Sequence, residues 1–282
     1  MGTDAGIVAN KLAFLRVCGL TKSYARGSRF WRKHVDIDAL RGIDFDIPAG
    51  KTLGLVGTSG SGKSTVARCV ARLERPDAGQ VYVDGTDISR TGTRGMRKFR
   101  RQIQMIFQDP ITSMNPRFSA AQVIEEPLLI HQRASKAERR RQVETWMSEV
   151  GLSPESADRS AMEFSGGQRQ RLAIARALVL QARILILDEA LSGLDLSTEA
   201  QIVNLLLELQ AAHSLTYLFI SHDLPLVARL TDTIAVISAG KIVEQGPTAR
   251  VIANPSHPAT KALVASAIAF QKNFPDLLGV SK

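Results

Sequence analysis

The most informative segment of this sequence is Gly57-Thr58-Ser59-Gly60-Ser61-Gly62-Lys63-Ser64-Thr65. It follows an apolar run, Leu53 to Val56, that is typical of a buried strand, and it precedes the helical pattern of Val66 to Leu73. Its spacing fits G-x-x-x-x-G-K-[ST], in which glycines let backbone N–H groups turn toward phosphate oxygens beside a positive helix N-terminus. The stretch therefore predicts a phosphate-binding loop between a strand and a helix.

Two side chains of this loop have distinct predicted roles. Lys63 is expected to reach the β- and γ-phosphates of a nucleotide, and the Ser64 hydroxyl is expected to ligate Mg²⁺. A flexible Gly/Ser turn is the alternative, but a chance match in a chain of this length occurs about once in a hundred. Nucleotide binding is therefore favoured, with contacts from Gly57, Ser59, Gly60, Ser61, Gly62, Lys63, Ser64 and Thr65.

A second candidate site is the apolar segment Ile184 to Leu187, which ends in Asp188 and Glu189. A carboxylate at the tip of a strand beside the phosphate loop can hold Mg²⁺, so Asp188 is predicted as the metal-binding residue. A carboxylate one residue further on can orient the attacking water, and this predicts a catalytic role for Glu189. A strand end capped by solvated acids is common, but the combination with the loop favours the functional interpretation.

The segment Phe164 to Arg171 contains Ser165-Gly166-Gly167-Gln168, which predicts another anion-binding helix N-terminus. One nucleotide does not need two such cradles from a single chain. The pattern makes sense if Ser165 and Gly167 of one subunit close over the γ-phosphate held by another. A glycine-rich helix cap is the alternative for this segment taken alone.

The remaining pattern alternates strands and helices, which predicts an α/β fold with a largely parallel sheet. Val81 to Ile88, broken by Asp84-Gly85, is expected to form paired antiparallel strands at an edge. The segment from about Ser119 to Ser160 is helical and charged, which indicates a helical subdomain. Further strands are expected at Phe14 to Leu20, Ile43 to Ile47, Ile103 to Phe107, Thr216 to Ile220 and Ile234 to Ile237, and further helices around Glu199 to Ala212 and at Leu224 to Leu230.

On these residues the sequence resembles the ATP-binding subunits of ABC transporters over nearly the whole chain. Gly57 to Thr65 matches the Walker A motif, Gln108 the Q-loop, Ser165 to Gln168 the signature motif and Asp188 Walker B. Glu189 matches the catalytic glutamate, Ser192-Gly193-Leu194-Asp195 the D-loop, and His222 the switch histidine. The resemblance implies a P-loop ABC-type ATPase core that binds ATP and Mg²⁺ and hydrolyses ATP.

The same resemblance assigns the remaining roles. His222 completes the catalytic site, Gln108 contacts the γ-phosphate and the metal ion, and Tyr24 stacks on adenine. Asp195 and the signature residues contact the nucleotide. The implied ATP-binding domain spans residues 12–270, with a helical subdomain at about 115–165 and a C-terminal tail at 271–282.

A narrower resemblance is to the ATPases of oligopeptide, dipeptide and nickel importers. It is carried by Phe99 to Pro110, Met114 to Arg117, Phe164 and the tail segment Asn254 to Leu263. Ala259 stands where that group usually has an aromatic residue, Thr58 replaces a frequent acidic one, and the tail lacks the cysteine cluster of many members. No iron–sulfur centre is therefore implied.

For such a chain the expected partners are two transmembrane permease subunits and a second ABC ATPase, which is expected to be a paralogue rather than a second copy. An extracytoplasmic solute-binding protein is expected to act indirectly. The chain is expected to lie peripherally on the cytoplasmic face of the inner or plasma membrane, because it shows neither a secretory signal nor a segment of the ~20 apolar residues that span a bilayer.

Composition is compatible with this interpretation. The chain has 282 residues, 44% of them hydrophobic, and only two cysteines, Cys18 and Cys69, which favours buried free thiols. The net charge of +9 suits nucleic acid, anionic lipid or phosphate ligands. Basic clusters lie at 26–33, 94–101 and 133–141, where sparse aromatic residues favour a solvated surface, partly facing anionic lipid headgroups, over nucleic-acid binding.

Two rival functions remain at this stage. An ABC-type ATPase of DNA repair or chromosome organisation would suit a basic chain, but such proteins usually carry long coiled coils between the Q-loop and the signature motif. An ABC exporter subunit would share all the catalytic motifs, and only the importer-like tail argues against it.

Overall fold

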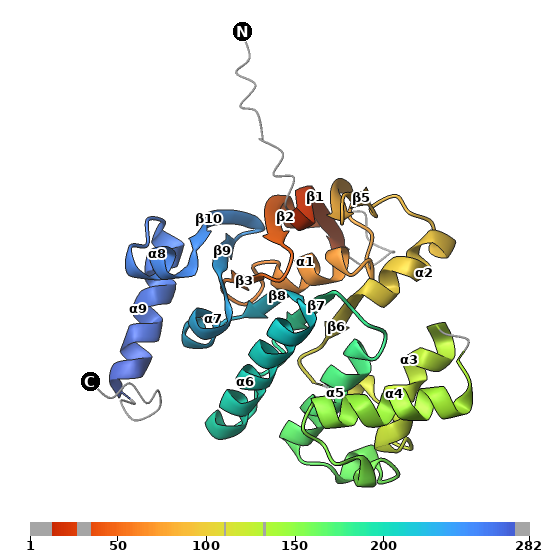
Figure 1. The fold of residues 1–282 in the computed structure, drawn as a ribbon. Coiled ribbons are helices and arrows are strands. Elements are labelled where there is room, and N and C mark those ends of the chain that lie inside the picture. Colours follow the sequence, from red (N-terminus) through yellow and green to blue (C-terminus); the bar gives the residue numbers. More distant parts are fainter. Residues whose placement is uncertain (1–12, 27–34, 110, 132–133, 274–282) are drawn as a thin grey trace.

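The structure, a computed structural model, describes residues 13–26, 35–109, 111–131 and 134–273. Most of the predicted basic cluster at 26–33, residue 133 of the third cluster, and residues 274–282 of the predicted tail lie outside the described residues. Two sheets and the helices between and around them make up the described part (Figure 1).

The central sheet has six strands in the order β10-β9-β3-β8-β7-β6. Neighbouring strands within this sheet run parallel, except that β10 pairs with β9 in the antiparallel direction. This confirms the predicted largely parallel sheet. The strands are β3 (Thr52–Val56), β6 (Ile103–Ile106), β7 (Ile184–Asp188), β8 (Thr216–Ser221), β9 (Thr233–Ser238) and β10 (Lys241–Pro247).

The other antiparallel strands form a sheet of their own, in the order β2-β1-β4-β5. They are β1 (Ala13–Arg26), β2 (Val35–Pro48), β4 (Ala78–Val83) and β5 (Thr86–Asp87). Asp84 and Gly85 form the expected turn, both with positive φ. β1 and β2 are far longer than their apolar runs predicted, because they pair with each other along almost their whole length.

Helix α1 (Lys63–Val70) packs between the two sheets. Its buried residues Val66, Ala67, Cys69 and Val70 belong to one hydrophobic cluster with the antiparallel sheet and with one face of the central sheet. The helix begins three residues earlier than its apolar pattern predicted, because Gly62 precedes it in a left-handed conformation and Lys63 is already helical.

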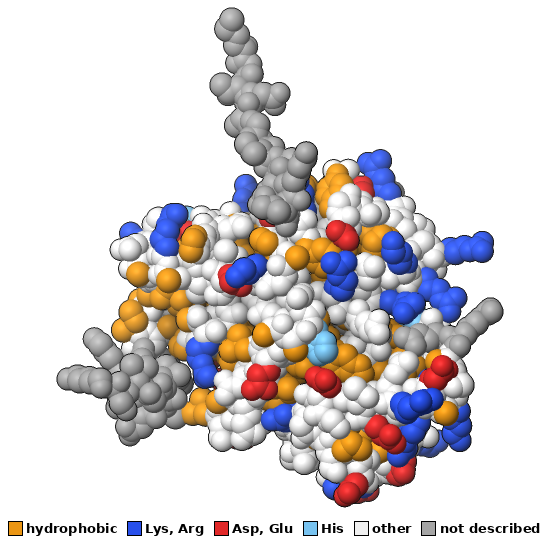
Figure 2. All heavy atoms as spheres, viewed as in Figure 1, with side chains coloured by type: hydrophobic (Ala, Val, Ile, Leu, Met, Phe, Trp, Pro, Cys, Tyr) orange, Lys and Arg blue, Asp and Glu red, His pale blue; other side chains and the backbone are white. Residues whose placement is uncertain are grey.

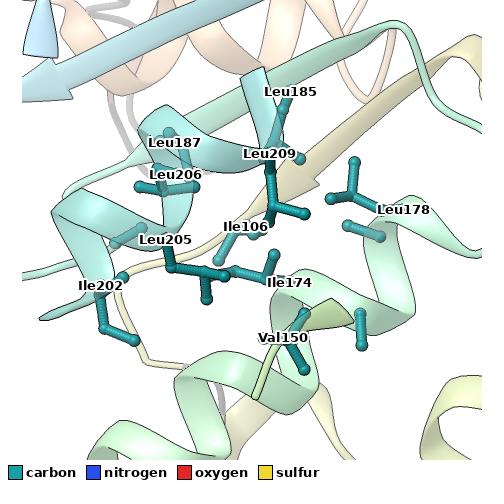
Figure 3. Packing of buried hydrophobic residues seen from close by; sticks show 14 of the residues in the cluster. Ile106, Val150, Ile174, Leu178, Leu185, Leu187, Ile202, Leu205, Leu206 and Leu209 are labelled. Atoms are coloured by element: carbon teal, nitrogen blue, oxygen red, sulfur yellow. The ribbon is translucent and has the colours of Figure 1, made fainter. Parts of the chain in front are cut away.

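The other helices cover the second face of the central sheet or lie at its ends. Alternate residues of β7 separate the two cores: Ile184 and Ile186 face the cluster around α1, whereas Leu185 and Leu187 pack with α5 and α6 (Figure 3). The remaining helices are α2 (Thr93–Gln102), α3 (Ala120–His131), α4 (Lys136–Glu149), α5 (Gly166–Leu178), α6 (Leu196–His213), α7 (Leu224–Leu230), α8 (Thr248–Ala253) and α9 (Pro258–Asn273), with short 3-10 turns at Ile111–Ser113, Pro154–Ser156 and Ala161–Glu163.

Helices α3 and α4 pack with α5 at one end of the molecule, below α2 in the view of Figure 1. Of the helices in the described ranges, none has both the length and the apolar character required to cross a bilayer.

A buried carboxylate attaches the C-terminal helices to the sheet. Glu244 of β10 is 8% exposed and accepts hydrogen bonds from the N–H groups of Ser256, at 2.9 Å, and His257, at 2.9 Å. Burial alone would raise the pKa of Glu244, but the polar groups of Thr260, His257 and Ser256 outweigh it and bring the pKa to about 2. The charged form of Glu244 therefore holds the turn that precedes α9.

Glu244→Gln should lower the free energy of unfolding by about 1 kcal/mol at neutral pH, because hydrogen bonds to a charged acceptor are stronger than those to a neutral one. The folded-state pKa lies below the ordinary value of 4.5, so this stabilisation is complete above pH 4.5 and is lost as the pH falls toward about 2. Urea unfolding of both proteins at several pH values should show the difference shrinking on acidification. Glu144→Gln, at an exposed carboxylate of α4, is the control and should change stability by about 0.5 kcal/mol or less.

Candidate functional site

Three neighbouring strands bring the predicted site residues to one edge of the central sheet. β3 pairs with β8, which pairs with β7, all in parallel, and Val56 lies opposite Ser221 while Asp188 lies opposite Ile220. The carboxyl ends of these strands therefore coincide. The phosphate loop follows β3, Glu189 follows β7 and His222 follows β8, so segments far apart in the sequence meet here (Figure 1).

The loop from Gly57 to Gly62 is tightly enclosed. A Cβ atom on Gly57 would lie 2.3 Å from the carbonyl oxygen of Ile237, so no other residue fits there without a shift. Gly62 has φ +111°, and its Cβ would meet the carbonyl oxygen of Ala39 at 2.6 Å. The Ser61 hydroxyl is buried and has no hydrogen-bond partner among the residues that the structure describes. A buried unpaired hydroxyl in a glycine-rich loop fits the expected phosphate oxygens.

The Lys63 ammonium group lies inside this loop. Only 5% of the residue is exposed, and Nζ donates to the carbonyl oxygens of Gly57, at 2.8 Å, and Thr58, at 3.0 Å. Burial lowers the pKa of Lys63, and the nearby carboxylates of Glu189 and Asp188 oppose that shift. The loop thus holds a desolvated cation close to two acids.

Asp188 and Ser64 lie side by side, as a shared metal site requires. The Ser64 hydroxyl donates to Oδ1 of Asp188 at 3.1 Å. Asp188 is 8% exposed, and burial raises its pKa, while the hydrogen bond from Ser64 acts in the opposite direction. Paired hydroxyl and carboxylate oxygens are ligands that suit Mg²⁺, so the residues present fit that ion.

Glu189 and His222 face each other across this edge, with Oε1 of Glu189 3.5 Å from Nδ1 of His222. Glu189 has a left-handed backbone, φ +50°, which is uncommon for a non-glycine residue. Three hydrogen bonds fix this conformation: the N–H of Glu189 donates to Ile220, and both the N–H and the hydroxyl of Ser192 donate to the carbonyl oxygen of Glu189, at 3.1 and 2.8 Å.

A cavity of about 170 Å³ extends from this pair toward Glu199 and Asp223. Burial raises the pKa of Glu199, and the negative charge of Asp223 adds to that effect. Sequence reasoning assigned no role to Glu199 and treated Ser192 only as part of the D-loop. The left-handed backbone of Glu189 is the feature that reveals the supporting role of Ser192, and a backbone conformation cannot be seen in the sequence.

Tyr24 lies near the phosphate loop and contacts two neighbouring side chains, Glu74 and Lys22. It is 37% exposed, its hydroxyl donates to Glu74, and the ammonium of Lys22 lies 5.6 Å from its ring centroid. Partial burial and Glu74 raise the pKa of the Tyr24 hydroxyl, whereas Thr65 at the end of the phosphate loop lowers it. The ring of the predicted adenine-stacking residue is therefore anchored beside Thr65.

The signature segment forms a capped helix start. The hydroxyl of Ser165 accepts from the N–H of Gln168 at 3.3 Å, and the side chain of Gln168 accepts from the N–H of Ser165 at 2.9 Å. A Cβ on Gly167 would lie 2.4 Å from Cγ2 of Thr198, so this glycine is also required for close packing of α5 on α6. Asp195 caps α6 through the N–H and hydroxyl of Thr198.

Gln108 lies beside the signature segment rather than beside the phosphate loop. It is exposed, and together with Asp109, Gly166, Arg169 and Gly193 it lines a cavity of about 410 Å³. Within the described ranges, no hydrogen bond or ion pair connects Ser165–Gln168 with the loop at Gly57–Thr65. The chain thus gathers Lys63, Ser64, Asp188, Glu189 and His222 in one place and holds Ser165–Gln168 in another.

Comparison with known proteins agrees with this arrangement. The family model described as "ABC transporter" matches residues 40–192. The chain is 45% identical over 256 residues to a probable peptide ABC transporter ATP-binding protein of Sinorhizobium fredii, covering 90% of this chain and 72% of that protein. It is 44% identical over 260 residues to the oligopeptide transport ATP-binding protein AppF of Bacillus subtilis, covering 92% and 79%.

Solved structures give the same result for the fold. The ATP-binding cassette MJ0796, determined as a dimer in a post-hydrolysis state with ADP and phosphate, matches with a TM-score of 0.73 and 28% identity over 83% of this chain and 98% of that one. The structure of cbiO1 from Clostridium perfringens, part of an ABC transporter complex, matches with a TM-score of 0.76 and 26% identity over 93% and 96%.

The geometry of the site and the relationships to known proteins lead to the same conclusion. A loop encloses Lys63, two carboxylates follow at the end of β7, and a histidine follows β8. The chain belongs to the ABC transporter family of ATP-binding proteins.

Proposed function

We propose that this chain is the ATP-hydrolysing subunit of a peptide-type ABC importer. The observation that carries the proposal is the convergence of Lys63, Asp188, Glu189 and His222 at one edge of the sheet. The relatives named for peptide and oligopeptide transport support a peptide-like solute, and they cover about nine-tenths of this chain.

In this proposal the loop at Gly57–Thr65 binds the phosphates of ATP. Lys63 supplies a desolvated positive charge, Ser61 supplies an unpaired hydroxyl, and Tyr24 supports the base. Ser64 and Asp188 would hold Mg²⁺, with Gln108 as a further ligand when it moves toward them. Once bound, the ion would neutralise charge on the transferring phosphoryl group.

Glu189 would orient and polarise the attacking water. Its carboxylate is held beside His222 by a backbone that Ser192 fixes, so little reorganisation is needed at the moment of reaction. His222 would donate a hydrogen bond toward the γ-phosphate and keep Glu189 in place. Asp188 differs from Glu189 because it is buried and paired with Ser64.

The separation of the signature segment supports a site shared between two chains. The N–H groups at the start of α5 would form an anion-binding helix end, yet no hydrogen bond within the described ranges joins them to the phosphate loop of the same chain. We propose that Ser165, Gly166, Gly167, Gln168 and Asp195 contact the nucleotide held by a second ATPase, which would be a paralogue. ATP would close the pair and hydrolysis would reopen it.

An apolar groove supports contact with permease subunits. A cavity of about 450 Å³ lies between β6, α3 and α5, with Leu73 (59% exposed) and Ile130 (61% exposed) at its surface. Phe107, adjacent to Gln108, lines it as well. A cytoplasmic segment of a transmembrane subunit seated here would sense movements of Gln108. In this proposal the chain would lie on the cytoplasmic face of the membrane, and a solute-binding protein would act on the other side.

The rival functions receive less support. Between Gln108 and Ser165 the described α-helices are α3, of 12 residues, and α4, of 14 residues, which pack on each other and on α5. Such short packed helices are unlike the long coiled coils of DNA-repair and chromosome-organising ATPases. The relatives named above are peptide and oligopeptide transport proteins, and a further relative of Brucella ovis, 44% identical over 252 residues, is named as a putative peptide import ATP-binding protein.

Glu189→Gln should abolish turnover, by about 10²–10⁴-fold, because a positioned general base contributes that range, while ATP binding persists. Steady-state phosphate release and nucleotide-binding titrations on the purified transporter would measure both. Glu199→Gln is the matched control, since it removes a carboxylate from the same cavity without touching the Glu189–His222 pair. Wild-type turnover by Glu189→Gln would exclude Glu189 as the catalytic base.

Lys63→Ala should weaken ATP binding by about tenfold to a hundredfold, because a charge-assisted hydrogen bond contributes ~1.5–3 kcal/mol. Isothermal titration calorimetry would measure the affinity. Lys51→Ala provides the control, because Lys51 lies just before the same strand β3 and pairs with Asp232 on the surface. Equal affinities of wild type and Lys63→Ala would show that the loop does not bind phosphate.

The subunit composition of the transporter can be measured directly. A complex purified through a tag on this chain should contain two permease subunits, one copy of this chain and one non-identical ATPase, as read by native mass spectrometry. Two copies of this chain and no paralogue would contradict the heteromer while leaving the shared site intact. A tagged chain that never copurifies with membrane subunits would contradict the transporter function.

A further inference from the structure

Helix α2 carries a stripe of positive charge. Arg94, Arg97, Lys98 and Arg101 are spaced i, i+3, i+4 and i+7, so they share one side of the helix, and α2 contains no acidic residue. The opposite side is anchored by the buried residues Met96 and Phe99. Figure 2 shows Lys and Arg side chains gathering over the region of α2, at the right of the view.

The structure does not neutralise this stripe. Within the described part of the chain, none of its four cations forms an ion pair, and the guanidinium of Arg97 instead donates to the carbonyl oxygen of Ile130 at 3.1 Å. Burial lowers the pKa of nearby His131, and Arg97, Arg101 and Arg100 lower it further. Besides burial, three basic side chains of α2 therefore act on this one imidazole.

The stripe borders a hollow and an apolar rim. Arg97, Lys98, Arg101, His131 and Arg183 line a cavity of about 460 Å³. His131 and Leu180 also line the groove proposed for a permease segment, so the two are continuous. Leu129, 57% exposed, and Ile130, 61% exposed, project from the end of α3 nearby. We call the four cations of the stripe together with Leu129 and Ile130 the α2 surface.

We infer that the α2 surface binds the headgroups of anionic phospholipids. Cations beside exposed aliphatic side chains match a membrane interface, which is charged at the headgroups and apolar just beneath. The inference rests on the proposed function, because continuity with the permease groove turns this surface toward the bilayer. Nucleic acid fits less well, since the one aromatic residue of α2, Phe99, is buried and cannot stack on a base.

Vesicle cosedimentation of the purified full chain tests this inference. Wild-type protein should bind vesicles of equal parts phosphatidylglycerol and phosphatidylcholine, should not bind pure phosphatidylcholine, and should dissociate as salt shortens the Debye length below about 8 Å. The variant R94Q/K98Q/R101Q should bind about a hundredfold more weakly, because each basic residue near an anionic leaflet contributes roughly fivefold.

The matched control is K241Q/R250Q/K261Q, which removes three exposed cations of β10, α8 and α9 that form no ion pair within the described residues, and which leaves the stripe intact at the other side of the molecule (Figure 1). It should retain binding within about twofold, because exposed charges beyond a Debye length of the membrane are screened. Equal loss in both variants would overturn the inference, since net charge alone would then explain binding. Equal binding of wild type to both vesicle compositions would also overturn it.

Two further outcomes separate lipid from other ligands and from the proposed function. If R94Q/K98Q/R101Q binds anionic vesicles like wild type but no longer copurifies with permease subunits, the surface recognises an acidic protein segment and the inference is wrong. ATP binding by the same variant should be unchanged, because α2 supplies no residue of the nucleotide site. Selective vesicle binding by a chain that fails to hydrolyse ATP would contradict only the proposed function.

Discussion

The in-register pairing of β3 with β8 and of β8 with β7 is the constraint on which the rest of the site depends. Because these strands are parallel, the loop after β3, the acids after β7 and the histidine after β8 must emerge at the same edge. A shift of one residue in β8 would turn its side chains to the opposite faces of the sheet. The two hydrophobic cores also take alternate residues of β8, with Tyr217 and Phe219 in one and Leu218 and Ile220 in the other, and this packing opposes such a shift.

The site also shows how burial and charge are balanced. Lys63 lies close to Asp188 and Glu189 at the bottom of the loop, and its positive charge and the carboxylates offset part of one another's desolvation cost, whereas the charge of Glu189 adds to the cost of ionising Asp188. Removing Lys63 would leave two neighbouring carboxylates without that compensation. The loop can therefore offer a concentrated positive charge to phosphate oxygens and still remain folded when it is empty, because Lys63 is held by two backbone carbonyl groups.

Much of this fold and site could be predicted from the sequence. The apolar run at Leu53–Val56, the glycine spacing of the loop and the acids after Leu187 are local signals, and each identifies its strand and the residues that follow it. Other features depend on distant contacts. The length of β1 and β2 is set by their mutual pairing, the packing of Gly167 by Thr198, and the backbone of Glu189 by Ser192. No local pattern contains that information.

Helix α6 contacts two other helices, α5 and α4, at its opposite ends. At its first turn Thr198 packs against Gly167 of α5, and at its last residue the ring of His213 lies 5.2 Å from the ring of Trp146 in α4. Its 18 residues span about 27 Å at 1.5 Å per residue. Both ends of α6 contact the helical part, and α5 also packs directly on α4, so the three helices form one connected unit. A displacement of α5 by a facing subunit would therefore carry α4 and α6 along with it.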